Sequence, residues 1–146
     1  MQTRSPRPRT RMRIGAVLAA TASALIAWSA ISPLGGVDLV VPTGTTTRTV
    51  DALDVAFAAV LSGVAGWCVA ALLQRRADRP RRTWLATATT VFVLSLTGPL
   101  TSGAAASVTG SLVALHAVVA AVVIPQLART LPAGPVRVGR AAPARS

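Results

Sequence analysis

The sequence predicts an all-α membrane protein: four antiparallel transmembrane helices in one bundle, with a short extracytoplasmic β-hairpin-like loop between helices 1 and 2. Two observations predict it. Four long apolar runs alternate with short polar segments, and each run approaches the ~20 residues that cross a bilayer. Charged residues make up only 13% of the chain and lie almost entirely between these runs. This separation is expected because a charge at the bilayer centre costs at least ~2.5 kcal/mol.

The apolar runs define one transmembrane domain over residues 14–127, with spans at about residues 14–31, 52–73, 84–100 and 107–127. The first run, after a basic start, could instead be a secretory signal. A signal's apolar core is only ~7–15 residues long, so we expect a retained helix.

The two ends of the chain are rich in Arg and Pro and have no apolar periodicity. This composition predicts a disordered basic tail over residues 1–13 and a flexible basic tail over residues 128–146.

The longest loop, Ser32–Asp51, contains two stretches rich in β-branched residues, Val37–Val41 and Thr45–Val50, on either side of a Gly-containing break. This pattern is typical of a short hairpin. An isolated hairpin is only marginally stable in water, so we expect it to lie on the helix ends. Asp51 and Asp54 begin the second run, where acidic groups complement the helix dipole.

The distribution of arginine predicts the orientation of the helices. The segments before the first span, between spans two and three, and after span four hold five, five and four Arg, whereas the other two loops hold one and none. The positive-inside rule therefore places both termini in the cytoplasm. The clusters can also bind anionic lipid headgroups of the bilayer. The absence of Lys and Glu beside abundant Ala, Arg, Val and Thr is typical of a GC-rich bacterial genome, so we expect a bacterial plasma (inner) membrane.

The formal net charge of +11 could instead indicate nucleic-acid binding. The basic residues flank apolar runs, however, and no soluble stretch is long enough to present them on one folded face. We therefore expect no nucleic-acid partner.

Small residues recur at helical spacing, which allows helices to approach closely in a membrane. The first run repeats Ala at Ala16, Ala20 and Ala24. The second run contains the stripe Ser62, Gly66 and Ala70, and the fourth contains the stripe Gly110, Ala114, Ala117 and Ala121. We expect the stripe of the fourth run to pack against one neighbouring helix and the His116 side chain to face a second neighbouring helix.

Trp28 and Trp84 lie near the ends of their spans, and indole rings prefer the headgroup level of a bilayer. Both are therefore expected to be interface anchors.

The chain's single histidine, His116, lies close to the middle of the fourth apolar run. Ionisable groups inside membranes are functional candidates by default. A neutral histidine can also simply hydrogen-bond to a hydroxyl of a neighbouring helix, and both interpretations stay open. The candidate intramembrane polar site comprises His116, Thr109 and Thr90. A metal role has the least support because zinc needs three or four ligands and there is no second histidine.

Sequence motifs of enzymes are missing: there is no Walker loop, HExxH, GxSxG or CxxC. Four-span multidrug exporters are similar in size, but their coupling depends on a Glu in the first span, and this chain has no Glu. We therefore expect no catalytic activity, metal or cofactor.

Four segments together resemble an uncharacterised family of small four-helix integral membrane proteins of actinobacteria. They are GVDL (Gly36–Leu39), GWCVAALLQRR (Gly66–Arg76), LSLTGPL (Leu94–Leu100) and LHAVVAAVVIP (Leu115–Pro125). The resemblance implies four spans and a histidine in the last one, and it implies no activity.

Two functions remain. The small-residue stripes favour a non-enzymatic membrane protein that acts by association, as a homo-oligomer or with a partner membrane protein. The alternative is a small permease or channel-like subunit, in which His116 and the hydroxyls of the third span line a polar path.

Overall fold

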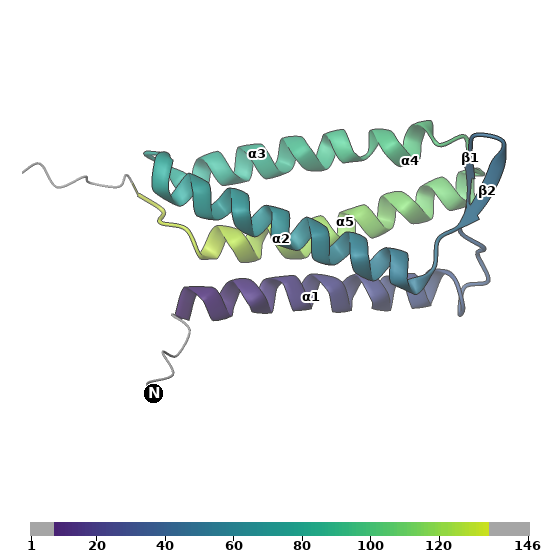
Figure 1. The fold of residues 1–146 in the computed structure, drawn as a ribbon, viewed down its shortest axis with the longest axis horizontal. Coiled ribbons are helices and arrows are strands. Elements are labelled where there is room, and N and C mark those ends of the chain that lie inside the picture. The colour runs from purple at the N-terminus through teal and green to yellow at the C-terminus, as the bar shows by residue number, and fades with distance from the viewer. Residues whose placement is uncertain (1–7, 135–146) are drawn as a thin grey trace, which may run out of the picture.

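A computed structural model gives the fold and describes residues 8–134 (Figure 1). Within that range, four helical segments are long and apolar enough to cross a membrane. The predicted four-helix architecture with a small sheet between the first two helices is therefore confirmed. The elements are α1 (Pro8–Ile31), β1 (Val40–Thr43), β2 (Thr46–Thr49), α2 (Ala52–Arg76), α3 (Pro80–Ser95), α4 (Thr97–Thr101) and α5 (Ala106–Arg129).

The third span consists of two helices, because α3 ends at Ser95 and α4 starts at Thr97. Pro99 has no N–H to donate to the carbonyl four residues earlier, so the α-helical ladder is interrupted there. The side chains of Ser95 and Thr97 hydrogen-bond to Phe92 O and Leu94 O at 2.7 Å each, which satisfies carbonyls next to the break.

The helices extend further than the apolar runs. Helix α1 begins at Pro8, so the expectation of a disordered tail is wrong for residues 8–13. At the other end, Ala128 and Leu131 are buried, so the expected flexible tail begins too early. Arg13, Ala128 and Leu131 are buried against neighbouring helices, a signal that local composition does not carry. The remaining parts of the two expected tails, residues 1–7 and 135–146, lie outside the described residues.

The predicted hairpin is present. Strands β1 and β2 pair antiparallel, with Val40 opposite Thr49 and Thr43 opposite Thr46. Gly44 in the turn has φ of 62°, a left-handed conformation that glycine adopts without steric cost. Just before β1, Leu39 is fully buried among the helix ends and so ties the hairpin to the bundle.

Helix α1 packs closely against both α2 and α5. Its predicted alanine stripe is buried, with exposed fractions of 1% for Ala16, 0% for Ala20 and 1% for Ala24. On α2, a Cβ added to Gly63 would lie 3.1 Å from a methyl group of Val17, so the two backbones approach closely at this point. Small side chains on α1 thus allow the tight packing that the sequence predicted.

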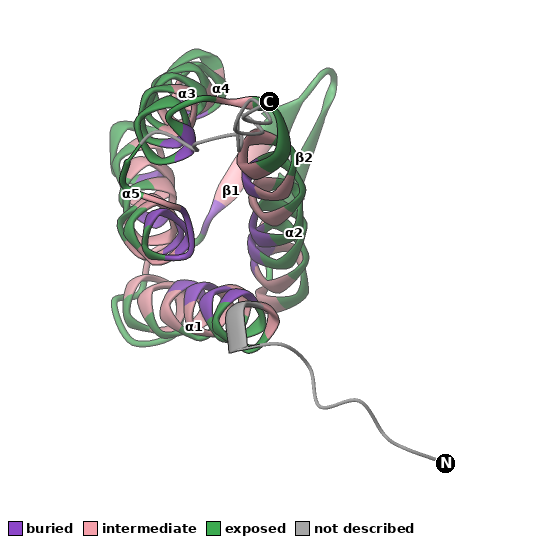
Figure 2. Cartoon of the chain, turned by 90° about the vertical axis from the view of Figure 1, so that its left-hand side faces the viewer, coloured by how far each residue is buried: buried purple, intermediate pink, exposed green. Residues whose placement is uncertain are grey.

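The bundle has two distinct ends (Figures 1 and 2). The hairpin end contains β1, β2 and the start of α2. The arginine end contains the start of α1, the α2–α3 turn at Ala77–Arg79 and the end of α5. Viewed along the helices, α1, α2, α3 and α5 occupy the corners of a four-sided bundle, and the buried residues face its inside (Figure 2).

Candidate site: a groove between α2, α3 and α5

A groove of about 770 Å³ lies between α2, α3 and α5 and reaches the hairpin. It exists because the three facing helices carry small side chains there, among them Ala59, Ala65, Ala88 and Ala120, which leave the space between the helices unfilled. Its lining is mostly apolar. Leu61 and Val91 line the groove and are also 57% and 59% exposed, so it opens to the outer surface of the bundle.

His116 lines this groove at mid-height on α5 and is half-buried. Its Nδ1 lies 2.8 Å from the carbonyl oxygen of Leu112, one turn earlier in the same helix. Because a carbonyl only accepts hydrogen bonds, Nδ1 donates, and in the tautomer with its single N–H at Nδ1 the other nitrogen, Nε2, is an acceptor. In the described chain every buried side-chain nitrogen and oxygen has a partner. Nε2 forms no hydrogen bond within the described residues, so it is not fully buried, and the His116 side chain lines the groove.

The candidate polar site of His116, Thr109 and Thr90 is not assembled. Thr90 is exposed, and Thr109 bonds to Ala104 O at 3.4 Å; neither lines the groove. The hydroxyls that share the groove with His116 come instead from Ser62, Thr87 and Ser95. Thr87 and Ser95 lie on the same face of α3 as Trp84, so the helical period measured from Trp84 would have found them.

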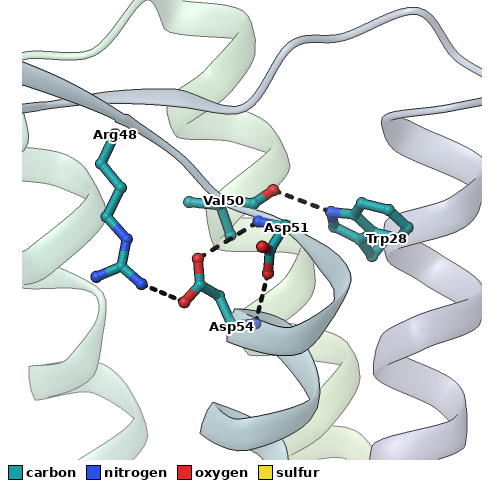
Figure 3. Close-up of polar contacts among 5 residues, drawn as sticks. All are labelled: Trp28, Arg48, Val50, Asp51 and Asp54. Atoms are coloured by element: carbon teal, nitrogen blue, oxygen red, sulfur yellow. Dashed lines mark hydrogen bonds and ion pairs between the residues drawn. The ribbon is translucent and has the colours of Figure 1, made fainter.

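The hairpin end of the groove is polar (Figure 3). Arg48 of β2 forms an ion pair with Asp54, and both residues line the groove. Asp54 also completes a capping box with Asp51, whose side chain accepts from the Asp54 backbone N–H at 2.9 Å. Trp28 of α1 donates from its indole nitrogen to Val50 O at 3.2 Å, which fixes the segment between β2 and α2.

The arginine end of the groove is closed by Trp84. Its side chain is only 3% exposed, and its indole N–H donates to Ile124 O at 3.0 Å. The expectation that Trp84 anchors the helix at the membrane surface stays a prediction. The indole finds its hydrogen-bond acceptor inside the bundle, and its ring fits over Gly66, where an added Cβ would lie 3.3 Å from it. Trp28 is also partly buried, and its polar atom faces the protein.

The small-residue stripes of α2 and α5 differ in how far they are buried inside the bundle. In α2, Ala70 is fully buried and Gly66 faces Trp84 and Leu127, but Ser62 is exposed and lines the groove.

In α5 the stripe is not used for packing inside the chain, so the expectation of a neighbouring helix there is wrong for a single copy. Gly110, Ala114, Ala117 and Ala121 are all exposed. The bundle is packed instead by Val108, Leu115, Val123 and Leu127, roughly on the other side of α5, because larger side chains bury more apolar surface.

The ionisable side chains that line the groove are Arg48, Asp54 and His116. Among residues 8–134, no group of three or more His, Cys, Asp or Glu is placed to hold a metal ion. His116 has no nucleophile as a hydrogen-bond partner, and Cys68 is exposed and does not line the groove. The arrangement offers an apolar cavity, one acceptor at mid-height and an ion pair at one end.

The chain has no significant match among curated proteins or solved structures. A family model does match residues 4–133, nearly the whole sequence. Its description is a family of unknown function (DUF6069), which agrees with the resemblance found in the sequence to an uncharacterised family. The chain therefore belongs to the DUF6069 family.

Proposed function

We propose that this chain is an integral protein of the bacterial plasma membrane that acts by association, and that it associates with a second copy of itself through the outer face of α5. It works in this proposal as a binding protein and performs no catalysis.

Insertion with both termini in the cytoplasm is supported by the charge at the two ends of the bundle. The arginine end has Arg75 and Arg76 in the last turn of α2 and Arg129 in the last turn of α5, and the hairpin carries Arg48 alone. Under the positive-inside rule the arginine end is cytoplasmic. Its basic side chains are then placed to attract anionic lipid headgroups.

The observation that carries self-association is the composition of the outward faces. Helices α1, α2 and α3 expose large apolar side chains, such as Leu18 (64%), Phe57 (71%) and Leu94 (61%). Helix α5 exposes no large apolar side chain at all. Its exposed residues are Ala106, Ser107, Gly110, Ala114, Ala117, Ala121, Pro125 and Arg129. A surface of small residues lets a second helix approach closely.

The spacing of this face favours one packing geometry. Ser107, Gly110, Ala114, Ala117 and Ala121 are separated by three, four, three and four residues. This is the 3.5-residue period of a left-handed supercoil. Two copies inserted in the same orientation bring their α5 helices together in parallel, about a two-fold axis along the membrane normal.

Disulfide crosslinking in native membranes tests this proposal, in a Cys68→Ser background because Cys68 is exposed. We expect Ala117→Cys to form a covalent dimer on oxidation, and Leu94→Cys, exposed on α3, to form little. Ala114→Leu should weaken crosslinking through Ala117→Cys, whereas Ala22→Leu, the same change at an exposed position of α1, should not. Equal crosslinking from α3 and α5, or a crosslink to a different protein only, would contradict self-association.

The permease alternative receives less support. The groove that contains His116 is lined mostly by apolar side chains, and Thr90 lies outside it. A flux assay in liposomes, comparing the native protein with His116→Ala, tests this alternative. Flux that depends on His116 would favour it over association.

A further inference from the structure

The two ends of the groove differ chemically, and the proposed self-association through α5 does not involve the groove. One end carries the Arg48–Asp54 pair, the other is closed by Trp84, and the walls between them are mostly apolar. Its volume of about 770 Å³ is within the ~300–1,000 Å³ of small-molecule sites. If the helices span a bilayer, the exposed groove edge at Leu61 and Val91 faces hydrocarbon, so molecules dissolved in the membrane reach it directly.

The one side chain in this groove with a ring nitrogen that forms no hydrogen bond within the described residues is His116. Its Nδ1–H bond to Leu112 O orients the ring and selects the tautomer, so Nε2 presents a lone pair. An acceptor at mid-height of an apolar groove favours a ligand that donates a hydrogen bond. Lipid acyl chains cannot do so, because they have no donor.

We propose that the groove binds a hydrocarbon-tailed amphiphile whose hydroxyl group donates a hydrogen bond to Nε2 of His116. The hydroxyl lies near mid-height, about 15 Å from the start of α5 at 1.5 Å per residue. The hydrocarbon tail lies along Ala88, Ala120 and Val123 and ends against Trp84. Long-chain alcohols and ring alcohols with an apolar tail belong to this class, whereas an alkane or an ether of the same length does not.

The single histidine makes a direct test possible, because protein labelled with ¹⁵N-histidine gives only one pair of ring nitrogen signals. The protein is placed in phosphatidylcholine nanodiscs, whose lipid has no hydrogen-bond donor. It is titrated with 1-decanol and, separately, with decyl methyl ether, whose ten-carbon chains match the roughly 12 Å along α5 from His116 to Ile124 beside Trp84. We expect the alcohol to shift the Nε2 signal and leave Nδ1 bonded as before. The ether should leave Nε2 unshifted and bind roughly three- to tenfold more weakly, the value of one hydrogen bond.

Two variants and a matched control test whether the alcohol binds in the groove. Ala88→Leu fills the groove from α3, and Ser62→Leu fills it from α2 at an exposed position where folding is least affected. Both should abolish the Nε2 shift. Ala86→Leu adds the same side chain to an exposed position of α3 that does not line the groove and should leave the shift unchanged. An equal response to alcohol and ether, no response to the alcohol, or a shift that survives Ser62→Leu would overturn the proposal.

Discussion

Arg13 of α1 donates a hydrogen bond from its guanidinium to the side-chain oxygen of Gln74 in α2, over a distance of 2.7 Å. Its Nε also donates to Thr130 Oγ1, just after α5, at 3.2 Å. The Arg13 side chain is 7% exposed, so a charged group is buried where three helices meet. Such a group is stable only with its partners in place.

Replacing Arg13 should therefore destabilise the bundle at its arginine end. Arg13→Ala leaves the Gln74 side-chain oxygen without its donor and removes the hydrogen bond that Thr130 Oγ1 accepts, and we expect a loss of about 2 kcal/mol in the free energy of unfolding. Denaturation of the purified protein in detergent measures it. Arg11→Ala, which removes an exposed arginine two residues earlier, is the control. Equal stability of the two variants would contradict a structural role for Arg13.

The alanine stripe of α1 should tolerate no larger residue. Ala20 is fully buried, so Ala20→Leu forces α1 away from its neighbours, at a cost of about 1–3 kcal/mol for overpacking. Ala22→Leu places the same side chain on the exposed face of the same helix and should change stability little. Thermal unfolding of the two variants side by side checks this. A normal melting temperature for Ala20→Leu would show that α1 packs less tightly than the structure has it.

The sequence predicted the fold because its main signals are local. Apolar runs separated by arginine define the spans, β-branched stretches around Gly44 define the hairpin, and the four-residue repeat from Ala16 defines a packing face. The ends of the helices were less predictable. Residues 8–13 look disordered by composition, yet the buried bonds of Arg13 to Gln74 and Thr130 depend on residues 61 and 117 positions away.

The candidate site was predicted only in part, because it depends on how the helices are rotated relative to one another. His116 could be singled out as the one ionisable residue of its span. Which hydroxyls share its groove depends on the rotation of α3, which turns Thr87 and Ser95 inward and Thr90 outward. The stripe at Gly110 has the same ambiguity, because a face of small residues suits an inner and an outer helix contact equally.

The cap of α2 should contribute measurably to stability. The Asp51 side chain accepts from the Asp54 backbone N–H, and Asp54 in turn accepts from the Asp51 N–H at 3.4 Å. Asp51→Ala should cost about 1 kcal/mol, the usual value of such a cap. Asp38→Ala, an exposed aspartate in the same loop whose side chain forms no bond within the described chain, is the control. Equal denaturation curves would argue against the capping box.

The orientation of the helices can be tested by cysteine labelling in a Cys68→Ser background. Thr45→Cys lies in the hairpin turn and Asp78→Cys in the turn between α2 and α3, and both positions are exposed. We expect a membrane-impermeant maleimide added to intact cells to label Thr45→Cys, and to label Asp78→Cys only after permeabilisation, because the positive-inside rule predicts that the arginines beside Asp78 keep that turn in the cytoplasm.

The labelling result also bears on the groove and on the α5 face. With the hairpin outside, the Arg48–Asp54 end of the groove faces the extracytoplasmic side, and amphiphiles reach it from the outer leaflet. Labelling of Asp78→Cys in intact cells would instead mean that the Arg48–Asp54 end of the groove faces the cytoplasm. A mixture of labelled and protected protein at both positions would mean that copies insert in both orientations. The α5 helices of two copies would then meet antiparallel, where the spacing of three and four residues from Ser107 to Ala121 no longer implies a parallel two-fold pair.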